Sequence, residues 1–391
     1  MGRCALLALL AACGRIDFDI AHDAAQDPIA NCVVGPNLQV SNAAGASRAP
    51  ALAGTGDGFA LAWSDNRDGN FEIYLSTFDA IGTPIIRELR VTTTAAASVV
   101  PSIGWSGSSY ALLWGEDLGN NTYQSMFQEI AGDGAPIGAA VALGQIASGF
   151  VPSRAQRWID TSYALAWQAN AGGNDEIFFA RLSNAGTQVI PDTQLTMAAG
   201  GSGFPSLAWS GSELGVAWND DRDGNNEIYF ARVSATGQKL TGDVRITNAP
   251  ASSFAPGLER AGDRYLLTWW DDRSGTSEIY VRALDDSGVP LGDELQPDPG
   301  QYGQVAVARW SGAELGMIWA DFRNGILEPY FGRLDDTGAK LGDDQRVSTG
   351  GLDIELDGHD LAWTGARFAI AWGDKRTGDP ELYVALADCS P

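Results

Sequence analysis

The hydrophobic positions of the chain recur in short runs separated by Gly, Ser, Asn and Asp. The clearest block covers residues 205–249 and holds four such runs, LAWS, LGVAW, EIYFARV and DVRIT. Each run alternates with polar residues or is apolar throughout, and each is bounded by turn-forming residues, so each predicts a short β-strand. The block therefore predicts four strands with no helix between them.

A tryptophan in the second run marks this block along the whole chain. It recurs every 50 to 53 residues, at Trp63, Trp114, Trp167, Trp218, Trp269, Trp319 and Trp372. Four strands in a period of about 50 residues are typical of propeller blades, whereas solenoid coils usually repeat in shorter steps or alternate with helices. The sequence predicts an all-β fold, a seven-bladed β-propeller with four-stranded blades.

The two ends of the repeat predict how the ring closes. The seventh copy stops after three runs, at LYVALAD, while NLQVSN at residues 37–42 precedes the first copy and matches the fourth run. We expect this N-terminal strand to complete the last blade and remove its exposed edge. The loop between the second and third strands and the loop between blades should then emerge on one face, here named the top face.

Five of the seven copies carry the motif W-x-D-x-R-x-G-x-x-E-I-Y or a close variant after the central tryptophan. Its charged residues are Asp65, Arg67, Glu72, Asp220, Arg222, Glu227, Asp271, Arg273, Glu278, Asp321, Arg323, Glu328, Asp374, Arg376 and Glu381. We interpret the motif as a tight hairpin in which the Asp and the Glu bracket one Arg, with Gly supplying a positive φ. Because five blades repeat it, we expect a structural role, with the Trp and Tyr packed between blades.

This motif resembles the repeat of a broad set of bacterial secreted and lipoprotein propellers, of the sialidase-like or TolB-like seven-bladed type. The activities of that set are largely undefined. The resemblance covers the whole domain and implies a fold rather than a function.

The first residues are similar to a bacterial lipoprotein signal. Arg3 is followed by the apolar run 5–12 and then by Cys13-Gly14, and this run is too short to span a bilayer as a helix. The resemblance implies that residues 1–12 are a signal peptide, that Cys13 is lipidated, and that Gly14 favours the outer membrane. The alternative is a buried apolar strand with an incidental cysteine.

The remaining chain divides into a tether and a domain. Residues 13–34 contain the lipidated cysteine and an acidic stretch without periodicity, which predicts a flexible tether of about 25 Å. Residues 35–391 form the propeller. We expect an exported, monomeric domain anchored to the membrane of the cell envelope through its N-terminal lipid.

The net charge limits the classes of partner that the domain could bind, and the cysteine content bears on its cellular compartment. The formal net charge of −24 argues against nucleic acid and anionic lipid as partners of the domain. Cys32 and Cys389 remain after the signal and anchor cysteines are set aside, and in an exported protein they are candidates for a disulfide. Closing a loop of about 360 residues would contribute at most roughly 5–6 kcal/mol in the chain-entropy model. Two free buried thiols are the alternative.

A calcium site is the one cofactor hypothesis for the motif loops. Asp221, Asp223, Asn225 and Glu227 place oxygens at alternating positions, as a short calcium loop does. The other blades mostly lack the second carboxylate of this series, so a structural loop without a cofactor is the favoured interpretation.

The motif is lost in blades two and three, which are neighbours in the ring. Glu116 and Leu118 replace Asp and Arg in blade two, where Tyr123 stands at the expected position of Glu, and Ala169 and Ala171 replace Asp and Arg in blade three. Drift is the simple explanation, but loops on a rigid scaffold are where binding residues concentrate.

Aromatic residues precede or begin the inner strand of several blades. They are Phe150, Phe204, Phe254 and Tyr302, and they either ring the mouth of the channel as an apolar rim or wedge between blades.

Catalytic patterns are scarce. The sequence has no sialidase Asp-box, no GxSxG, HExxH or CxxC motif, and two histidines, of which His22 lies in the tether and His359 is expected at the surface. We therefore expect a non-catalytic binding or scaffolding propeller of the cell envelope with a protein or glycan partner. The alternatives are a carbohydrate-active enzyme that uses a carboxylate pair on the top face, and a purely structural envelope protein.

Overall fold

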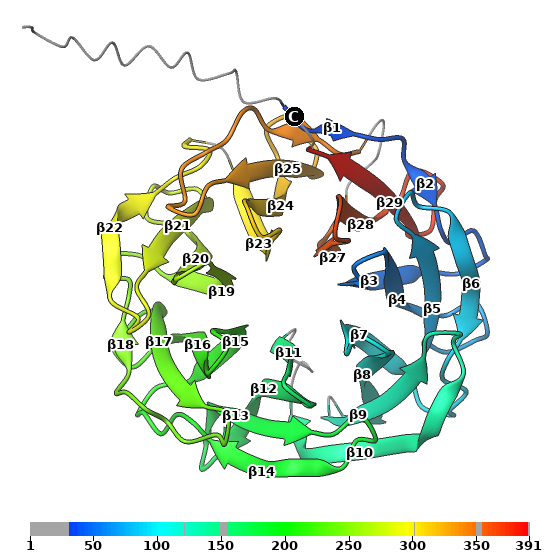
Figure 1. Ribbon diagram of the computed structural model, residues 1–391, viewed down its shortest axis with the longest axis horizontal. Coiled ribbons are helices and arrows are strands. Elements are labelled where there is room, and N and C mark those ends of the chain that lie inside the picture. The colour runs from blue at the N-terminus through cyan, green and yellow to red at the C-terminus, as the bar shows by residue number, and fades with distance from the viewer. Residues whose placement is uncertain (1–30, 121, 149–154, 301, 349–353, 390–391) are drawn as a thin grey trace, which may run out of the picture.

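The computed structural model describes residues 31–120, 122–148, 155–300, 302–348 and 354–389. In this part of the chain all regular structure is β-strand, and the strands form seven antiparallel sheets in a ring around a central channel (Figure 1). Six sheets have four strands, and the seventh has five because its outer strand is in two pieces. The predicted seven-bladed β-propeller is confirmed.

The first strand of each blade lines the channel and the second packs directly behind it (Figure 1). The first strands of blades 1 to 7 are β3 (Ser47–Gly54), β7 (Ser98–Trp105), β11 (Ala155–Ile159), β15 (Ser202–Trp209), β19 (Ser253–Ala261), β23 (Gly303–Trp310) and β27 (Ile354–Trp363). The second strands are β4 (Gly58–Asp65), β8 (Ser109–Gly119), β12 (Ser162–Ala171), β16 (Glu213–Asp220), β20 (Arg264–Asp271), β24 (Leu315–Asp321) and β28 (Phe368–Asp374).

The third and fourth strands complete each blade toward the outside. The third strands are β5 (Glu72–Asp79), β9 (Thr122–Ala131), β13 (Asn174–Leu182), β17 (Glu227–Ser234), β21 (Glu278–Leu284), β25 (Glu328–Leu334) and β29 (Glu381–Asp388). The fourth strands of blades 1 to 6 are β6 (Pro84–Arg90), β10 (Pro136–Ser148), β14 (Gln188–Gln194), β18 (Val244–Arg245), β22 (Pro290–Leu295) and β26 (Gln345–Arg346).

The pattern of each run follows from its place in the blade. The second strands are buried along most of their length because neighbouring blades cover both faces, so their residues are apolar at consecutive positions. One core cluster, for example, joins Phe179 of blade 3 to Trp218 of blade 4. The central tryptophans of blades 1, 4, 5, 6 and 7 are almost fully buried and lie beside the motif tyrosine, as Trp269 does beside Tyr280, with ring centroids 5.8 Å apart. The expected packing between blades is confirmed.

The N-terminal segment closes the ring as expected. β2 (Leu38–Gln39) and a further short strand, β1 (Val33–Val34), both pair with β29 and so take the place of the fourth strand of blade 7. A disulfide joins Cys32 to Cys389 beside this closure, over a sequence separation of 357 residues.

The loops divide into the two expected faces. On the top face, the loop between β16 and β17 contacts the loop that leads to blade 5, because Asn225 Nδ2 donates to the carbonyls of Ala249 (3.3 Å) and Ala251 (2.7 Å). The opposite, bottom face carries the hairpins between first and second and between third and fourth strands. The chain enters the ring at this bottom face, where Asn31 Oδ1 accepts a hydrogen bond from the backbone N–H of Asp343 (2.9 Å).

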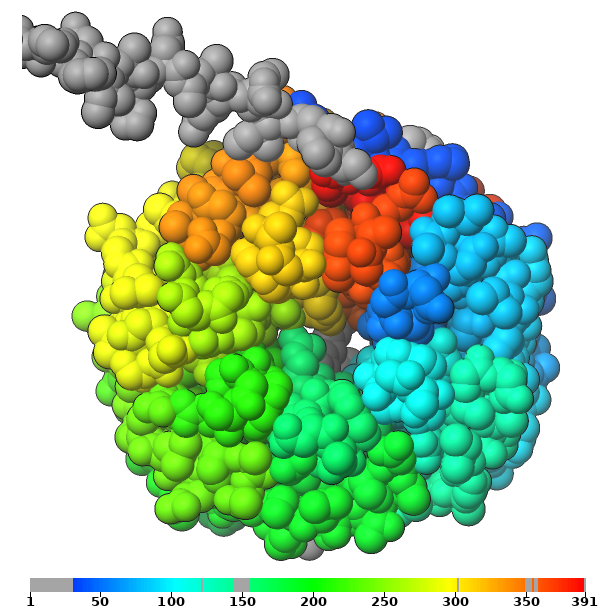
Figure 2. Space-filling model, in the orientation of Figure 1, coloured from blue at the N-terminus to red at the C-terminus, as the bar shows by residue number. Residues whose placement is uncertain are grey.

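The side chains leave an opening at the centre of the ring (Figure 2). Across the described ranges, the chain contains no helix that is long and apolar enough to cross a membrane.

Candidate functional site

The Asp of the repeated motif is a buried hydrogen-bond acceptor at the end of the second strand. In blade 4, the carboxylate of Asp220 accepts hydrogen bonds from Ser202 Oγ (2.7 Å), Trp218 Nε1 (3.2 Å) and Arg222 Nε (2.8 Å). Burial raises the pKa of this carboxyl, but the hydrogen bonds from Arg222 and Ser202 outweigh burial and hold the pKa below its usual value. Asp220 thus remains charged, and its hydrogen bonds connect the first strand, the second strand and the top loop of the blade.

The motif arginine connects this acceptor to the outer strand. Arg222 donates to Asp220 through Nη2 (2.5 Å) and to Asp243, which precedes β18, through Nη1 (2.8 Å). Its guanidinium carbon lies 4.4 Å from the centroid of the Tyr229 ring. The planar guanidinium therefore binds two carboxylates at its edge and an aromatic ring at its face.

The motif glutamate does not share this arginine, so the predicted bracket of Asp and Glu around one Arg is wrong. Glu227 instead accepts hydrogen bonds from Arg245 Nη2 (2.8 Å) and Thr247 Oγ1 (2.5 Å). The reason is the register: Asp220 and Glu227 are direct cross-strand partners. Because two like charges opposite each other repel, each carboxylate has hydrogen-bond donors of its own, which in blade 4 include a separate arginine for each.

The other motif blades repeat these contacts with changes in the outer partner. The arginine binds the motif Asp in Arg67–Asp65, Arg273–Asp271, Arg323–Asp321 and Arg376–Asp374. The outer carboxylates that bind Arg67, Arg273 and Arg323 are Glu88, Glu294 and Asp344, respectively. The motif glutamates have separate partners: Arg90 for Glu72, Gln296 for Glu278, Arg346 for Glu328 and Ser41 for Glu381. In blade 7 the N-terminal segment thus supplies the partner that the fourth strand supplies elsewhere.

The candidate calcium ligands are occupied by protein donors. Asp221 accepts a backbone N–H, Asp223 accepts a tyrosine hydroxyl and lies 3.1 Å from Arg245 Nη1, and Asn225 Nδ2 donates to Glu227 (3.1 Å). Among the described residues, these carboxylates do not belong to a group of three acidic or sulfur ligands close enough to share an ion. The sequence spacing therefore does not produce the converging oxygens that calcium needs.

Blades 2 and 3 replace the motif loop by longer hairpins. The β8–β9 ladder extends to the pair Gly119 and Thr122, and β12 and β13 are joined by Gly172 and Gly173, which have φ values of 74° and 115°. Two consecutive positive φ values are those of a type I′ turn, which continues the twist of a two-stranded ladder. Backbone hydrogen bonds thus fill the place that the ion pairs occupy in the other blades.

Two candidate binding residues of blade 2 have different roles. Glu116 accepts hydrogen bonds from Ser98 Oγ (3.0 Å) and Trp114 Nε1 (3.1 Å), which are the equivalents of the serine and tryptophan that bind the motif Asp. It is therefore an internal acceptor and not a free binding group. Leu118 is 50% exposed on the top face.

The position assigned to Tyr123 was wrong by one residue. Glu116 pairs with Gln124, because the hairpin of blade 2 is one residue longer than a motif loop, and Tyr123 lies one position nearer the turn. In blade 3, Ala169 pairs with Glu176, which is buried and occupies the position of the motif glutamate. Blade 3 thus keeps a glutamate that the motif comparison did not detect, since the preceding Asp and Arg are absent.

The interface between blades 2 and 3 is incompletely filled. It contains a cavity of about 30 Å³ whose lining includes Leu113, Leu165, Trp167 and Asp192. Burial raises the pKa of the Asp192 carboxyl. The space is large enough for a water molecule but most of its lining is apolar, which disfavours hydration.

The predicted aromatic residues lie on the top face of three consecutive blades. Phe204 of blade 4 is 59% exposed. It occupies a bulge of the first strand with a positive φ of 51°, a conformation shared by Ala49, Val100, Ala255 and Val305 in other blades. Bulges redirect side chains, and in blade 4 the redirected residue is a large aromatic one.

Two aromatic pairs lie on blades 5 and 6. Phe254 stacks on Trp270 with ring centroids 4.7 Å apart, and Tyr302 meets Phe322 edge to face at 6.3 Å. Phe322 is 49% exposed. We name Phe204, Phe254, Trp270, Tyr302 and Phe322 the aromatic arc. The fourth predicted residue, Phe150, lies outside the described residues.

Sequence reasoning missed two members of the arc. Trp270 and Phe322 stand at variable positions of the motif, where the other copies carry unrelated residues. The sequence could have revealed them, because most repeats carry a polar or small residue at these two positions. An aromatic residue there departs from the common structural role of the position.

Comparisons with known proteins agree with the fold. No family model and no curated protein matches the chain. Similar solved structures include a prolyl endopeptidase (TM-score 0.55, 16% identity, 87% of this chain and 47% of that chain) and the acylaminoacyl peptidase of Pyrococcus horikoshii (0.50, 14%, 89% and 52%). A third is the oligogalacturonate lyase of Vibrio parahaemolyticus (0.54, 12%, 91% and 96%).

The chain spans about half the length of the two peptidases and nearly the whole of the lyase. At these identities the similarity establishes the propeller fold alone.

Two titratable side chains, His359 and Asp298, are engaged in internal contacts. His359 is fully buried in β27, and its Nε2 lies 2.7 Å from the carbonyl of Val305, so the expected surface position is wrong. The sequence could not reveal this, because a histidine among Gly and Asp is typical of a loop. Asp298 has a carboxyl pKa raised by burial and by the neighbouring Asp344, and Arg323 binds both carboxylates.

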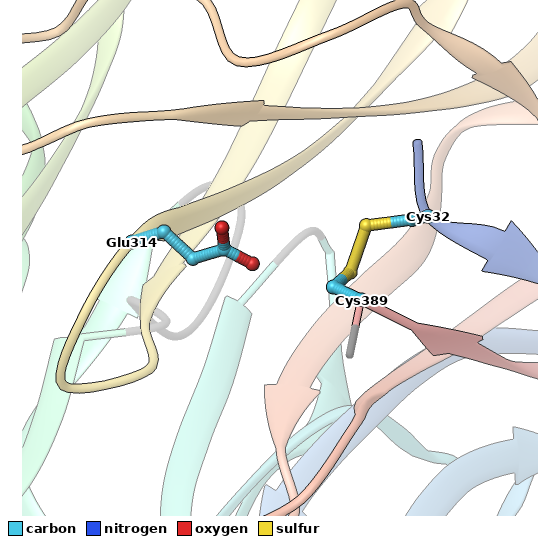
Figure 3. A group of neighbouring side chains, drawn as sticks. All are labelled: Cys32, Glu314 and Cys389. Carbon is cyan, nitrogen blue, oxygen red and sulfur yellow. A yellow bond between two sulfur atoms is a disulfide. The ribbon is translucent and has the colours of Figure 1, made fainter. Parts of the chain in front are cut away.

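The disulfide lies beside a carboxylate on the bottom face. The Glu314 side chain points toward Cys32 and Cys389, which are bonded to each other (Figure 3). Because the sulfurs are bonded, they offer no thiolate to a metal, and Glu314 itself binds Arg333 Nη1 (2.8 Å). This group is a brace at the ring closure.

Proposed function

We propose that the chain is a non-catalytic binding propeller of the cell envelope, and that the aromatic arc is its binding surface for a protein or glycan partner. The observation that carries the proposal is the distribution of exposed aromatic side chains. Among the strongly exposed large hydrophobic residues of the described ranges, the aromatic ones are Phe204 and Phe322, and both belong to the arc. The exposed aliphatic residues, such as Ile81, Ile85 and Val289, lie mainly near the outer strands.

Aromatic side chains are suited to this role. They bury large areas with few rotatable bonds, and they are enriched among the residues that dominate binding energy. Four of the five lie in ring pairs within a blade, Phe254 with Trp270 and Tyr302 with Phe322, so these four have less side-chain entropy to lose on binding.

The proposed anchor gives this surface a direction. If Cys13 carries a lipid, the chain reaches the domain at Asn31 on the bottom face, with a tether of about 25 Å between them. The aromatic arc on the opposite face would then point away from the membrane, toward the periplasm or the exterior.

The test compares partner capture by matched surface variants. Lipidated wild-type protein would be crosslinked in intact cells, solubilised in detergent and purified with its partner. We expect the double substitution Phe204→Ser and Phe322→Ser to lose the partner, and the control Val289→Ser and Leu291→Ser, which exchanges exposed residues on the bottom face, to keep it. Equal capture by both variants would contradict the proposed surface.

A Cys13→Ala variant tests the anchor separately. We expect it in the soluble fraction, because the acidic tether and domain have no other strong attraction to a membrane. Its recovery in washed membranes would contradict lipid anchoring without bearing on the aromatic arc.

A further inference from the structure

The ammonium group of Lys239 in blade 4 is held by three groups. It forms an ion pair with Asp243, the outer carboxylate that also binds the motif arginine, and it donates to the carbonyl of Leu195 in blade 3 (2.9 Å). It also lies 5.3 Å from the centroid of the Trp218 ring. A carboxylate, a carbonyl and an aromatic face together suit a primary ammonium, which has three donors and one positive charge.

The same lysine position recurs in blade 6. Lys340 Nζ lies 2.9 Å from the outer carboxylate Asp344. Each lysine pairs with a residue near the end of the third strand, Lys239 with Val233 and Lys340 with Leu334. The lysine and the outer carboxylate thus form a unit that two blades share.

Blade 3 has a glutamine in place of this lysine. Gln188 pairs with Leu182, which lies four residues after the third-strand partner of the central tryptophan, as Val233 does in blade 4. Gln188 is exposed. The position therefore carries no positive charge in blade 3.

The outer carboxylate is nevertheless kept in blade 3. Asp192 precedes the residue that pairs with Phe179, just as Asp243 precedes the residue that pairs with Phe230. Outer carboxylates elsewhere bind a motif arginine, which blade 3 lacks. Among the described residues no cation pairs with Asp192, and its carboxylate accepts a hydrogen bond from Gln188 Nε2 instead. Burial raises the pKa of this carboxyl, and the hydrogen bond offsets the effect only in part.

The other two partners of the lysine are kept as well. Trp167, the central tryptophan, is partly exposed, whereas those of the other six blades are 2% exposed or less. The carbonyl of Leu143 in blade 2 corresponds to that of Leu195. Each of these leucines follows the fourth-strand residue in the row of the central tryptophan, Ala142 in blade 2 and Gln194 in blade 3.

The cavity between blades 2 and 3 lies among these groups. It has a volume of about 30 Å³, and its lining includes Trp167, Asp192, Leu143 and Gln188. The outer strands of the two blades, β10 and β14, lie side by side at the rim of the ring (Figure 1). In blade 4 the corresponding groups surround the ammonium of Lys239, so the cavity marks the place of a missing cation.

We propose that this cavity binds the primary ammonium group of an alkylamine, which takes the place that Lys239 occupies in blade 4. The ammonium would donate to the Asp192 carboxylate and to the Leu143 carbonyl, with the Trp167 ring beside it. The methylenes of the ligand would lie against the apolar part of the lining and pass Gln188 toward solvent.

The two acceptors have room for this ligand. A carboxylate offers about four acceptor positions, and Asp243 holds a lysine and an arginine at once. Asp192 can therefore bind an ammonium and keep the hydrogen bond from Gln188. The Leu143 carbonyl accepts a hydrogen bond from Gln124 Nε2 (2.7 Å) and has a second lone pair.

Charge and coordination select this ligand class. The chain has a net charge of −24, which attracts cations. A bare metal ion needs more oxygen ligands than one carboxylate and one carbonyl supply. A quaternary ammonium has no N–H to donate, and an alcohol brings no charge to the carboxylate. The site is independent of the aromatic arc, since it uses other residues between other blades.

The experiment is a thermal-shift and calorimetric titration of the full chain with butylamine and cadaverine at up to about 10 mM. Butanol and tetramethylammonium are the matched probes, because the first lacks the charge and the second lacks the donors. We expect both amines to raise the Tm and to give a saturable heat, and neither matched probe to do so.

A further probe distinguishes the source of the ammonium. Nα-acetyl-lysine methylamide presents the same group as a lysine side chain of a protein does. Tighter binding of this compound than of cadaverine would assign the site to a partner's lysine, and the reverse order would assign it to a free amine.

Matched variants locate the site. Gln188→Lys supplies the lysine of blades 4 and 6, so it should raise the Tm and abolish amine binding. Val189→Lys adds the same charge at the next residue, which is 51% exposed and outside the cavity lining, and should bind as wild type does. Asp192→Asn keeps the shape of the side chain but should weaken binding roughly tenfold or more, since it removes a charged acceptor.

Three results would overturn the proposal. They are the absence of a saturable heat with both amines, equal binding of butanol, and undiminished amine binding by Gln188→Lys. The second result would leave the cavity as an apolar packing defect.

Discussion

Blades 1, 4, 5, 6 and 7 differ from blades 2 and 3 in how the top of the blade is held. In the first group a six-residue loop is fixed by ion pairs, as Arg222 fixes Asp220 to Asp243. In the second group the backbone ladder of the second and third strands extends further, and in blade 3 it ends in a two-residue turn. Blade 2 keeps the hydrogen bond to its central tryptophan through Glu116, whereas Trp167 of blade 3 is only partly buried.

The comparison shows that loss of a repeated motif need not indicate a binding surface. Blade 2 keeps the acceptor function of the motif Asp in Glu116, and blade 3 keeps the motif glutamate in Glu176. The difference between the groups lies instead in packing, since the interface between blades 2 and 3 contains a cavity. The exposed aromatic surface lies on blades 4 to 6, which all keep the motif.

The largest expected effect comes from removing the buried acceptor in a motif blade. Asp220→Ala deletes the acceptor of hydrogen bonds from Ser202, Trp218 and Arg222, and should lower the free energy of unfolding by about 3 kcal/mol. Urea unfolding measures the loss. The control Asp272→Ala, an exposed carboxylate in the motif loop of blade 5, should change it by less than about 0.5 kcal/mol. Equal losses in the two variants would contradict the assignment.

Low pH should weaken the motif blades through the same groups. The carboxyls of Asp65 and Asp220 have pKa values below their usual value of 3.8, because hydrogen bonds from their arginines outweigh burial. A lowered folded-state pKa contributes stability above the unfolded-state pKa, and this contribution is lost as pH falls through the folded-state pKa. The free energy of unfolding should therefore fall below about pH 4, and less steeply in Asp220→Asn. A pH dependence identical to that of the wild type would exclude Asp220 as a contributor.

The smallest expected effect tests the packing difference between the interface of blades 2 and 3 and that of the motif blades. Ala180→Val adds methyl groups beside the cavity between blades 2 and 3, and should stabilise the domain by up to about 0.7 kcal/mol if it fills the 30 Å³. The equivalent change in blade 4, Ala231→Val, meets a packed core and should destabilise by about 1–3 kcal/mol. Chemical unfolding of both variants measures the difference, and the same sign in both would contradict the packing difference.

The fold was predictable because the same pattern of four strands recurs along the chain in seven copies. The tryptophan spacing, the four runs and the displaced N-terminal run determine blade number, strand number and ring closure without any contact being known. The partner of Glu227 was not predictable, since it depends on Arg245, which lies on another strand and outside the motif. The one-residue shift in register at Tyr123 was not predictable either, because an inserted residue in a hairpin cannot be recognised until the strand pairing is known.

The candidate surface was predictable in part. Phe204, Phe254 and Tyr302 were found from their place before or within the first strands, whereas Trp270 and Phe322 required the register that places them beside those residues.

The central claim is that the repeated charges hold the blades and that binding belongs to other residues. Measuring the unfolding free energy and partner capture of Arg222→Ala, alone and with Arg67→Ala and Arg273→Ala, tests it most directly. Each substitution leaves two carboxylates facing each other, Asp220 and Asp243 in blade 4. Each should cost about 1–3 kcal/mol, nearly additively because the sites lie in different blades, while capture by the folded protein is unchanged. Loss of capture from one arginine with no change in stability would contradict the claim.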